Sequence, residues 1–177
     1  MRSATFALFA GIAYLSAGII GLIPAELSPP PADAPPLRYN VLYGHMLGVF
    51  PVNVLHDIVH LAIGAWGVSA WRADHHFGRG MGSPKLFARS IAIFYAALAL
   101  LGVIPATNTL FGLIPIYGHD VWLHAATALA ASYFGWRTEH EVERRAGEST
   151  DRRQQAVPVE VERRLGHADR RVPGSEV

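Results

Sequence analysis

Residues 4–23 read ATFALFAGIAYLSAGIIGLI, a run of 20 residues without a charged side chain. An α-helix needs about 20 predominantly apolar residues to cross the hydrocarbon core of a bilayer. A secretory signal peptide is the competing interpretation, because Arg2 stands before the run. The run is longer than the usual apolar core of such a peptide, so we predict a first transmembrane helix over residues 4–23.

Three further apolar segments follow, at residues 53–71, 86–105 and 120–136. The segment 86–105 is interrupted only by Arg89 near its start, where a long side chain can reach the membrane interface. At a rise of about 1.5 Å per residue each segment is long enough to span, the last one only just. The pattern predicts an all-α fold, a four-transmembrane-helix bundle formed by residues 1–137.

Charged residues are concentrated at the end of the chain. Residues 1–136 contain 6 Lys or Arg and 5 Asp or Glu, whereas residues 137–177 contain 9 of each. A soluble domain has about a quarter of its residues charged, so the first part is neither a water-soluble domain nor a basic nucleic-acid-binding surface. Residues 138–177 have few large apolar side chains and are predicted to form a disordered tail. The chain has no cysteine, which excludes disulfide bonds and thiolate metal sites.

The basic residues predict the orientation of the four spans. Arg38 falls on one side of the membrane, and the other basic residues near the spans fall on the opposite side: Arg2, Arg72, Arg79, Lys85, Arg89, Arg137, Arg144 and Arg145. Because cytoplasmic segments carry an excess of Lys and Arg, both termini are expected in the cytoplasm and the chain in the plasma (inner) membrane. The lipid bilayer is the expected partner, and the sequence specifies neither a protein partner nor a homo-oligomer.

An internal repeat accounts for the order of the segments. At an offset of 81 residues, Tyr14 matches Tyr95 and residues 21–25 match residues 102–106. At an offset of 64 residues, residues 48–51 match residues 112–115. At the second offset His60 aligns with His124, and His56 aligns with Asp120. Each unit contains two spans, so we predict two tandem two-helix repeats related by a pseudo-two-fold axis along the membrane normal.

Ionisable residues gather near the outer ends of the second and fourth predicted spans. His56 and His60 lie four residues apart on one helical face, and Asp120 and His124 have the same spacing. If the axis brings the two faces together, these four side chains converge about one turn below the outer interface. Ionisable residues inside a membrane are costly and usually functional. Two neighbours in sequence complete the cluster: Asp57 and His119.

Four interpretations of this cluster remain open. In the structural one, Asn53 and Asp120 cap helices while the histidines bond across helices and face interfacial water. In the second, His56, His60, Asp120 and His124 bind Zn, Fe or Cu, because the H-x-x-x-H spacing is found among metal ligands. In the third, His60 and His124 are the axial ligands of a haem. The fourth is a proton or ion path through these side chains.

Small residues are expected to set the helix contacts. Ala13, Ala17 and Gly21 form a stripe on the first predicted span. Such stripes allow close approach of helices in membranes, and we predict that this one packs inside the bundle.

Two short motifs stand at repeat-equivalent places. Residues 54–61 read VLHDIVHL and are followed by Gly64 and Gly67, and residues 120–124 read DVWLH. They resemble the LHNxVHL-like and DNWLH-like signatures of a family of small four-span bacterial membrane proteins with no assigned function. The resemblance covers about residues 4–136. It implies four membrane helices, and it implies no activity, substrate or cofactor.

Two positions depart from these signatures. Asp57 stands where the family usually has Asn, and Val121 replaces the Asn of the second motif. Asp57 is therefore expected to add a charge beside the histidines. A role that depends on the usual Asn is not carried over to this chain.

The function hypotheses follow from the cluster. We expect a non-enzymatic integral membrane protein without a cofactor, in which the His/Asp cluster orders the bundle and which acts through lipid or protein contacts. The alternative is a metal- or haem-binding membrane protein, with redox activity as one form of it. A small transporter or channel is a third hypothesis, disfavoured by the absence of charges deeper in the spans. The sequence contains no nucleotide-binding loop, nucleophile elbow or zinc-protease motif.

Overall fold

The computed structural model describes residues 3–75, 82–137 and 148. The chain divides into two units, Met1–Thr138 and Glu139–Val177. The helices and strands with described bounds all belong to the first unit. The predicted disordered tail, residues 138–177, lies outside the described residues except for Glu148.

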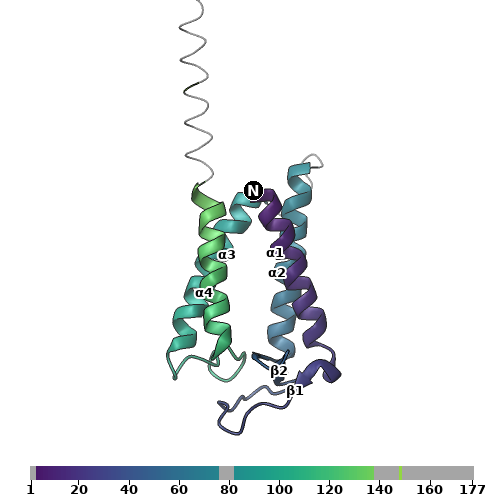
Figure 1. The fold of residues 1–177 in the computed structure, drawn as a ribbon, viewed down its shortest axis with the longest axis vertical. Coiled ribbons are helices and arrows are strands. Elements are labelled where there is room, and N and C mark those ends of the chain that lie inside the picture. Colours follow the sequence, from purple (N-terminus) through teal and green to yellow (C-terminus); the bar gives the residue numbers. More distant parts are fainter. Residues whose placement is uncertain (1–2, 76–81, 138–147, 149–177) are drawn as a thin grey trace, which may run out of the picture. The chain divides into compact units, whose positions relative to one another are not determined.

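Four helices run side by side in the first unit (Figure 1): α1 (Ser3–Gly21), α2 (Val54–His75), α3 (Pro84–Val103) and α4 (His119–Ser132), which continues into the π-helical turn η2 (Tyr133–Arg137). α1 packs mainly against α2, and α3 packs mainly against α4. Two of the described helices, α1 and α3, are long and apolar enough to cross a membrane. The chain is therefore mostly helical, with a helix at each of the four predicted spans.

Local sequence sets two of the helix ends. Ser83 caps α3, because its Oγ accepts a hydrogen bond from the Leu86 amide at 3.2 Å. Pro84 follows in the first turn, where a missing amide proton costs nothing. The second example is the C-terminal end of α1, which stops at Gly21, three residues before Pro24, and proline cannot continue a helix.

The chain between α1 and α2 forms the turn η1 (Pro24–Glu26) and a small antiparallel sheet of β1 (Leu27–Ser28), β2 (Gly44–Met46) and β3 (Phe50–Val52), in that order. This sheet is a correction to the all-α expectation. The prolines of this segment predict an extended loop, but the strands are too short to show the alternation by which a sequence reveals a strand. A tight turn pairs β2 with β3, and its residues Leu47 and Gly48 both have positive φ, 55° and 73°.

Asn53 joins two loops to the first turn of α2. Its Oδ1 accepts a hydrogen bond from the His56 amide at 3.0 Å, which caps the helix. Its Nδ2 donates to the carbonyl oxygen of Tyr39 at 2.9 Å and to that of Leu113 at 2.7 Å. The side chain is completely buried, so these three bonds hold the start of α2, and with it His56, in a defined position.

Glycines allow α1 and α2 to meet at backbone distance. A Cβ atom at Gly64 would lie 2.6 Å from the amide nitrogen of Leu15, and one at Gly11 would lie 2.7 Å from that of Val68. Real Cβ atoms do not come this close to backbone atoms, so only a residue without a side chain fits at either position. The contact fixes the distance between the two helices.

The small-residue stripe predicted for α1 is corrected in part. Gly21 is buried against α2 as expected, but Ala13 is exposed and Ala17 is half-buried. The buried small residues of α1 are instead Gly11, Gly18 and Gly21 together with alanines nearer its start. The physical reason is the short distance to α2, which a Cβ atom would prevent.

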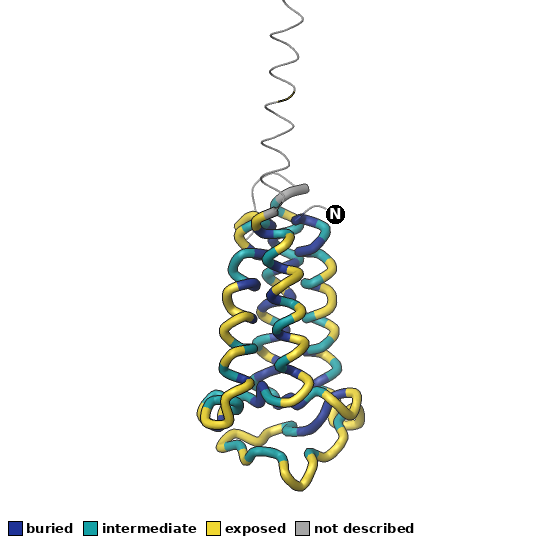
Figure 2. Tube along the Cα trace, turned by 60° about the vertical axis from the view of Figure 1, so that its left-hand side comes forward, coloured by how far each residue is buried: buried dark blue, intermediate teal, exposed yellow. Residues whose placement is uncertain are grey.

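The core lies among the helices, while their outer faces are strongly apolar. Phe87, Ile91 and Tyr95 of α3 are completely or almost completely buried. Figure 2 shows exposed residues running along the outside of the helices. Large apolar side chains that are strongly exposed include Ile93, Leu100, Trp122 and Leu129, by 66, 71, 75 and 74%. Such extensive apolar exposure is unusual for a water-soluble monomer.

Candidate functional site

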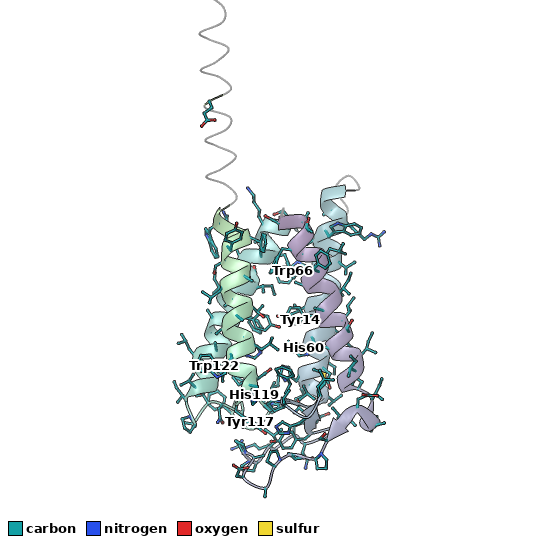
Figure 3. The ribbon with its side chains drawn as sticks, viewed as in Figure 1. Tyr14, His60, Trp66, Tyr117, His119 and Trp122 are labelled. Atoms are coloured by element: carbon teal, nitrogen blue, oxygen red, sulfur yellow. The ribbon has the colours of Figure 1, made fainter. Side chains whose placement is uncertain are left out.

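Two tyrosines and two histidines form a group of contacting rings among the four helices, where Tyr14 and His60 are labelled in Figure 3. The Tyr14 ring of α1 lies 5.5 Å from the His60 ring of α2, and the Tyr95 ring of α3 lies 4.9 Å from the His124 ring of α4, between centroids. Tyr14 and Tyr95 stack on each other at 5.4 Å. Aromatic contacts therefore join the α1–α2 pair to the α3–α4 pair.

Three buried polar side chains converge beside these rings: His56 of α2 and Asp120 and His124 of α4. One potential ligand atom of each lies within 4.8 Å of the other two. Oδ2 of Asp120 is 3.4 Å from Nε2 of His124 and 3.8 Å from Nε2 of His56. Each residue is at most 3% exposed. We call these three residues the His/Asp trio.

Hydrogen bonds within the protein leave atoms of this region without partners. Among the described residues, Oδ2 of Asp120 and Nδ1 of His56, His60 and His124 have no hydrogen-bond partner. An unsatisfied buried polar group costs about 1–3 kcal/mol. The cluster therefore contains unpaired nitrogen and oxygen atoms that a bound cation or a hydrogen-bonding ligand could satisfy.

His60 stands next to the trio, although its sequence spacing predicts the same site. Its ring centroid is 4.4 Å from that of His56, and its other neighbouring ring is Tyr14. The residue is 6% exposed, and the part that remains accessible lines a cavity. Of the four predicted ligands, three therefore come together, and the fourth lies beside them.

The other two predicted cluster residues lie elsewhere. The Asp57 carboxylate is completely buried against Gly21 at the end of α1, where any Cβ atom would overlap it. This corrects the expectation of a charge beside the histidines, because successive helical residues point in directions about 100° apart and Asp57 therefore faces α1. His119, labelled in Figure 3, is exposed in the first turn of α4.

A second polar group lies in the loops, outside the four helices. The hydroxyl oxygens of Tyr43 and Tyr117 are 2.6 Å apart, and the ring of His45 in β2 lies 6.1 Å from that of Tyr117. Burial, and to a lesser extent repulsion from His119, lowers the pKa of His45 below its ordinary value. Burial and the bond to Tyr43 raise the pKa of Tyr117. Both groups are therefore neutral at pH 7.

A cavity of about 340 Å³ lies between α1 and α4, next to the trio and over the strands β2 and β3. Its walls are mostly apolar, and four of its side chains carry aromatic six-membered rings: Phe6, Phe9, Tyr14 and Phe50. Polar groups in the wall are the Tyr14 hydroxyl, His60, Asp120 and Thr127. Asp120 therefore belongs both to the trio and to the cavity wall.

Sequence reasoning did not identify Tyr14 and Tyr95 as part of the site. The available signal was the predicted internal repeat, in which the two tyrosines would occupy equivalent positions. The cavity has no sequence signal, because its lining comes from four separate parts of the chain.

Comparisons with known proteins place the helical unit in one family. No curated protein and no solved structure matches this chain. The model of a family described as Domain of unknown function (DUF4383) matches residues 4–137. The matched region contains the trio, the four contacting rings and every residue of the cavity wall. The chain therefore belongs to the DUF4383 family.

Proposed function

We propose that this protein is an integral membrane protein that crosses the bilayer four times and binds one divalent transition-metal ion between His56, Asp120 and His124. The observation that carries the proposal is the approach of three buried ligand atoms, from two helices, to within 4.8 Å of one another. Two imidazoles and one carboxylate form a donor set that suits Zn²⁺ or Fe²⁺ and leaves a coordination position open.

The separations within the trio support an ion of this kind. Metal–ligand bonds of about 2.0–2.2 Å in a tetrahedral site leave the ligand atoms roughly 3.4 Å apart. The Asp120–His124 separation already has that value, at 3.4 Å. Nε2 of His56 is 3.8 Å from the same carboxylate oxygen, and the three ligand atoms lie within 4.8 Å of one another, so His56 would move toward both partners to complete the site.

The purely structural interpretation has less support. It needs histidines that hydrogen-bond across the helices, yet Nε2 of His56 is 3.8 Å from Oδ2 of Asp120, beyond hydrogen-bond distance, and the Nδ1 atoms of His56, His60 and His124 have no partner among the described residues. A haem held by His60 and His124 is disfavoured by packing, because the ring of His56 contacts both, at centroid distances of 4.4 and 6.2 Å. A bare ion would link α2 to α4, so its expected role is to hold the helix pairs together, and we do not expect an enzyme.

The lengths of two helices and the exposed apolar side chains of the other two support four membrane spans. α1 and α3 are long and apolar enough to cross a membrane, and α2 and α4 run beside them. α2 and α4 also expose large apolar side chains, among them Ile58 by 53% and Trp122 by 75%. Because α2 and α4 lie beside two helices of spanning length, we expect them to span as well. The distribution of Lys and Arg supports cytoplasmic termini in the plasma membrane.

Ring contacts support the tandem two-helix repeat. The contact of Tyr14 with His60 recurs, at the sequence offsets of the repeat, as the contact of Tyr95 with His124. The stacked pair of tyrosines would then lie on the pseudo-two-fold axis. In transporters built from internal repeats, substrate and ion sites likewise lie at the interface of the repeats.

The metal content of the full-length protein tests this proposal. The protein is purified in a non-ionic detergent, without chelator and without a polyhistidine tag, and its metals are measured by mass spectrometry. We expect roughly one zinc or iron ion per chain, and a loss of about tenfold or more in affinity in His56→Ala and in His124→Ala. His119→Ala is the matched control, because His119 is exposed on the same helix as His124, and it should retain the ion.

Thermal unfolding gives the second measurement. Removal of the ion by a chelator should lower the melting temperature, and added metal at about 100 times its Kd should restore about 2.7 kcal/mol of stability. A protein that is metal-free as purified, and whose melting responds to neither Zn²⁺ nor Fe²⁺, would refute metal binding and favour the structural role.

A further inference from the structure

We propose that the cavity between α1 and α4 binds the ring of a quinone-type amphiphile, whose apolar tail extends into the bilayer. This inference rests on the membrane insertion proposed above, but it does not require the ion. It assigns a role to His60, which lies beside the His/Asp trio and outside it.

The size of the cavity limits the ligand to a ring and its substituents. Small-molecule sites in proteins range from about 300 to 1,000 Å³, and the volume here is about 340 Å³. A complete lipid does not fit, so the rest of an amphiphilic ligand must lie outside. Between α1 and α4 few residues are in contact, and the cavity is only partly enclosed, which gives such a tail a way out.

The walls favour a flat ring over an acyl chain. Phe6 and Phe9 of α1 and Phe50 of β3 contribute aromatic rings, and Tyr14 contributes a fourth. Aromatic groups bind flat rings in offset-stacked or edge-to-face arrangements, which are worth more than the buried area alone. A flexible chain gains only the burial of its surface and loses conformational freedom.

The polar groups of the wall favour a neutral head that accepts hydrogen bonds. His60 is buried and lines the cavity, and a neutral imidazole has one N–H to donate. A quinone carbonyl oxygen is a suitable acceptor. The residues lining the cavity include no Lys or Arg to pair with an anionic head, and Asp120 would repel one. A cationic head is not favoured either, because the Asp120 carboxylate already faces His56 and His124.

Photolabelling of the full-length protein in lipid nanodiscs tests the proposal. The probe is an azido-substituted benzoquinone with a decyl tail, and labelled residues are mapped by mass spectrometry. We expect labelling on α1 or α4 at the cavity wall, displaced by decylubiquinone. Ala13→Phe and Ala130→Phe each put a ring into the cavity, from opposite helices, and should reduce labelling about tenfold or more. If one variant does not fold, the other still gives the result.

Two control variants separate this site from the ion site. Ala97→Phe adds the same ring on an exposed part of α3, away from the cavity wall, and should label as the wild type does. His60→Leu should weaken decylubiquinone binding by about 3–10-fold, the loss of one hydrogen bond. If the wild-type protein binds no metal but is still labelled at the cavity wall, the metal site is refuted and the quinone site is not.

Competition identifies the ligand. Decanol, which has the tail without the ring, should not displace the probe. If monodecanoylglycerol displaces the probe as well as decylubiquinone does, the cavity takes lipid acyl esters and the quinone assignment is wrong. Labelling that survives in both Ala13→Phe and Ala130→Phe would also overturn the proposal.

Discussion

Replacing Gly64 by alanine is expected to push α1 and α2 apart and to loosen the His/Asp trio. A Cβ atom at this position would lie 2.6 Å from the amide nitrogen of Leu15 and 2.8 Å from the carbonyl oxygen of Gly11. Both are backbone atoms of α1, so no side-chain rotation can relieve the overlap. The two helices must therefore move.

The size of the effect follows from these distances. Non-bonded heavy atoms prefer separations of about 3.5–4.0 Å, so the helices must separate by roughly 1 Å. Overpacking of this kind costs about 1–3 kcal/mol, and the better helix propensity of alanine returns about 0.8–1 kcal/mol. We expect a net loss of roughly 1 kcal/mol in the free energy of unfolding. A movement of roughly 1 Å in α2 also displaces His56, and loss of such support for a metal ligand costs about 10–100-fold in affinity.

Two assays measure these changes in parallel. Unfolding by sodium dodecyl sulfate in mixed micelles, followed by tryptophan fluorescence, gives the change in stability. Titration with Co²⁺, followed by its visible absorption, gives the change in metal affinity. The matched control is Ala62→Val, which adds more volume on an exposed part of the same helix and should change stability by less than about 0.5 kcal/mol. Equal stability and equal Co²⁺ affinity in the two variants would refute the reasoning that backbone contact at Gly64 positions α2.

Three further predictions concern the loops and the topology. Asn53→Ala should destabilise the protein by roughly 2–3 kcal/mol in the same unfolding assay, because one helix cap and two hydrogen bonds to loop carbonyls are lost, and a loss below about 0.5 kcal/mol would contradict this. Since the pKa of His45 is lowered in the folded state, its contribution to stability is complete above pH of about 6.5 and declines as the pH falls below that value. Unfolding measured over a pH series should therefore show a shallower acid decline in His45→Gln than in the wild type, and identical profiles would count against a buried neutral imidazole. The chain has no cysteine, so single cysteines report the topology in intact cells whose outer membrane, if present, is permeabilised. Ala32→Cys should react with an impermeant maleimide added outside these cells, and Ser175→Cys should react only after lysis. The reverse pattern would show that the proposed topology is inverted.

Local sequence accounts for the helices and for their order. A long apolar run is a property of consecutive residues, and its length alone indicates a helix that can cross a bilayer, so a helix occurs at each predicted span. The spacing of Asp120 and His124 likewise determines that they share one face of α4, since residues four apart on a helix are neighbours. The prolines after α1 exclude a helix for the same local reason.

Only the tertiary structure decided which polar side chains meet. His56 of α2 reaches Asp120 and His124 of α4, whereas His60 lines the cavity and Asp57 faces α1. The rotation of one helix against another depends on contacts between residues distant in sequence, so the spacing of residues within one helix does not determine it. The strand pairing of β2 with β3 and the cavity between α1 and α4 are decided in the same way, because each arises from side chains and backbone groups that the chain brings together only when it is folded.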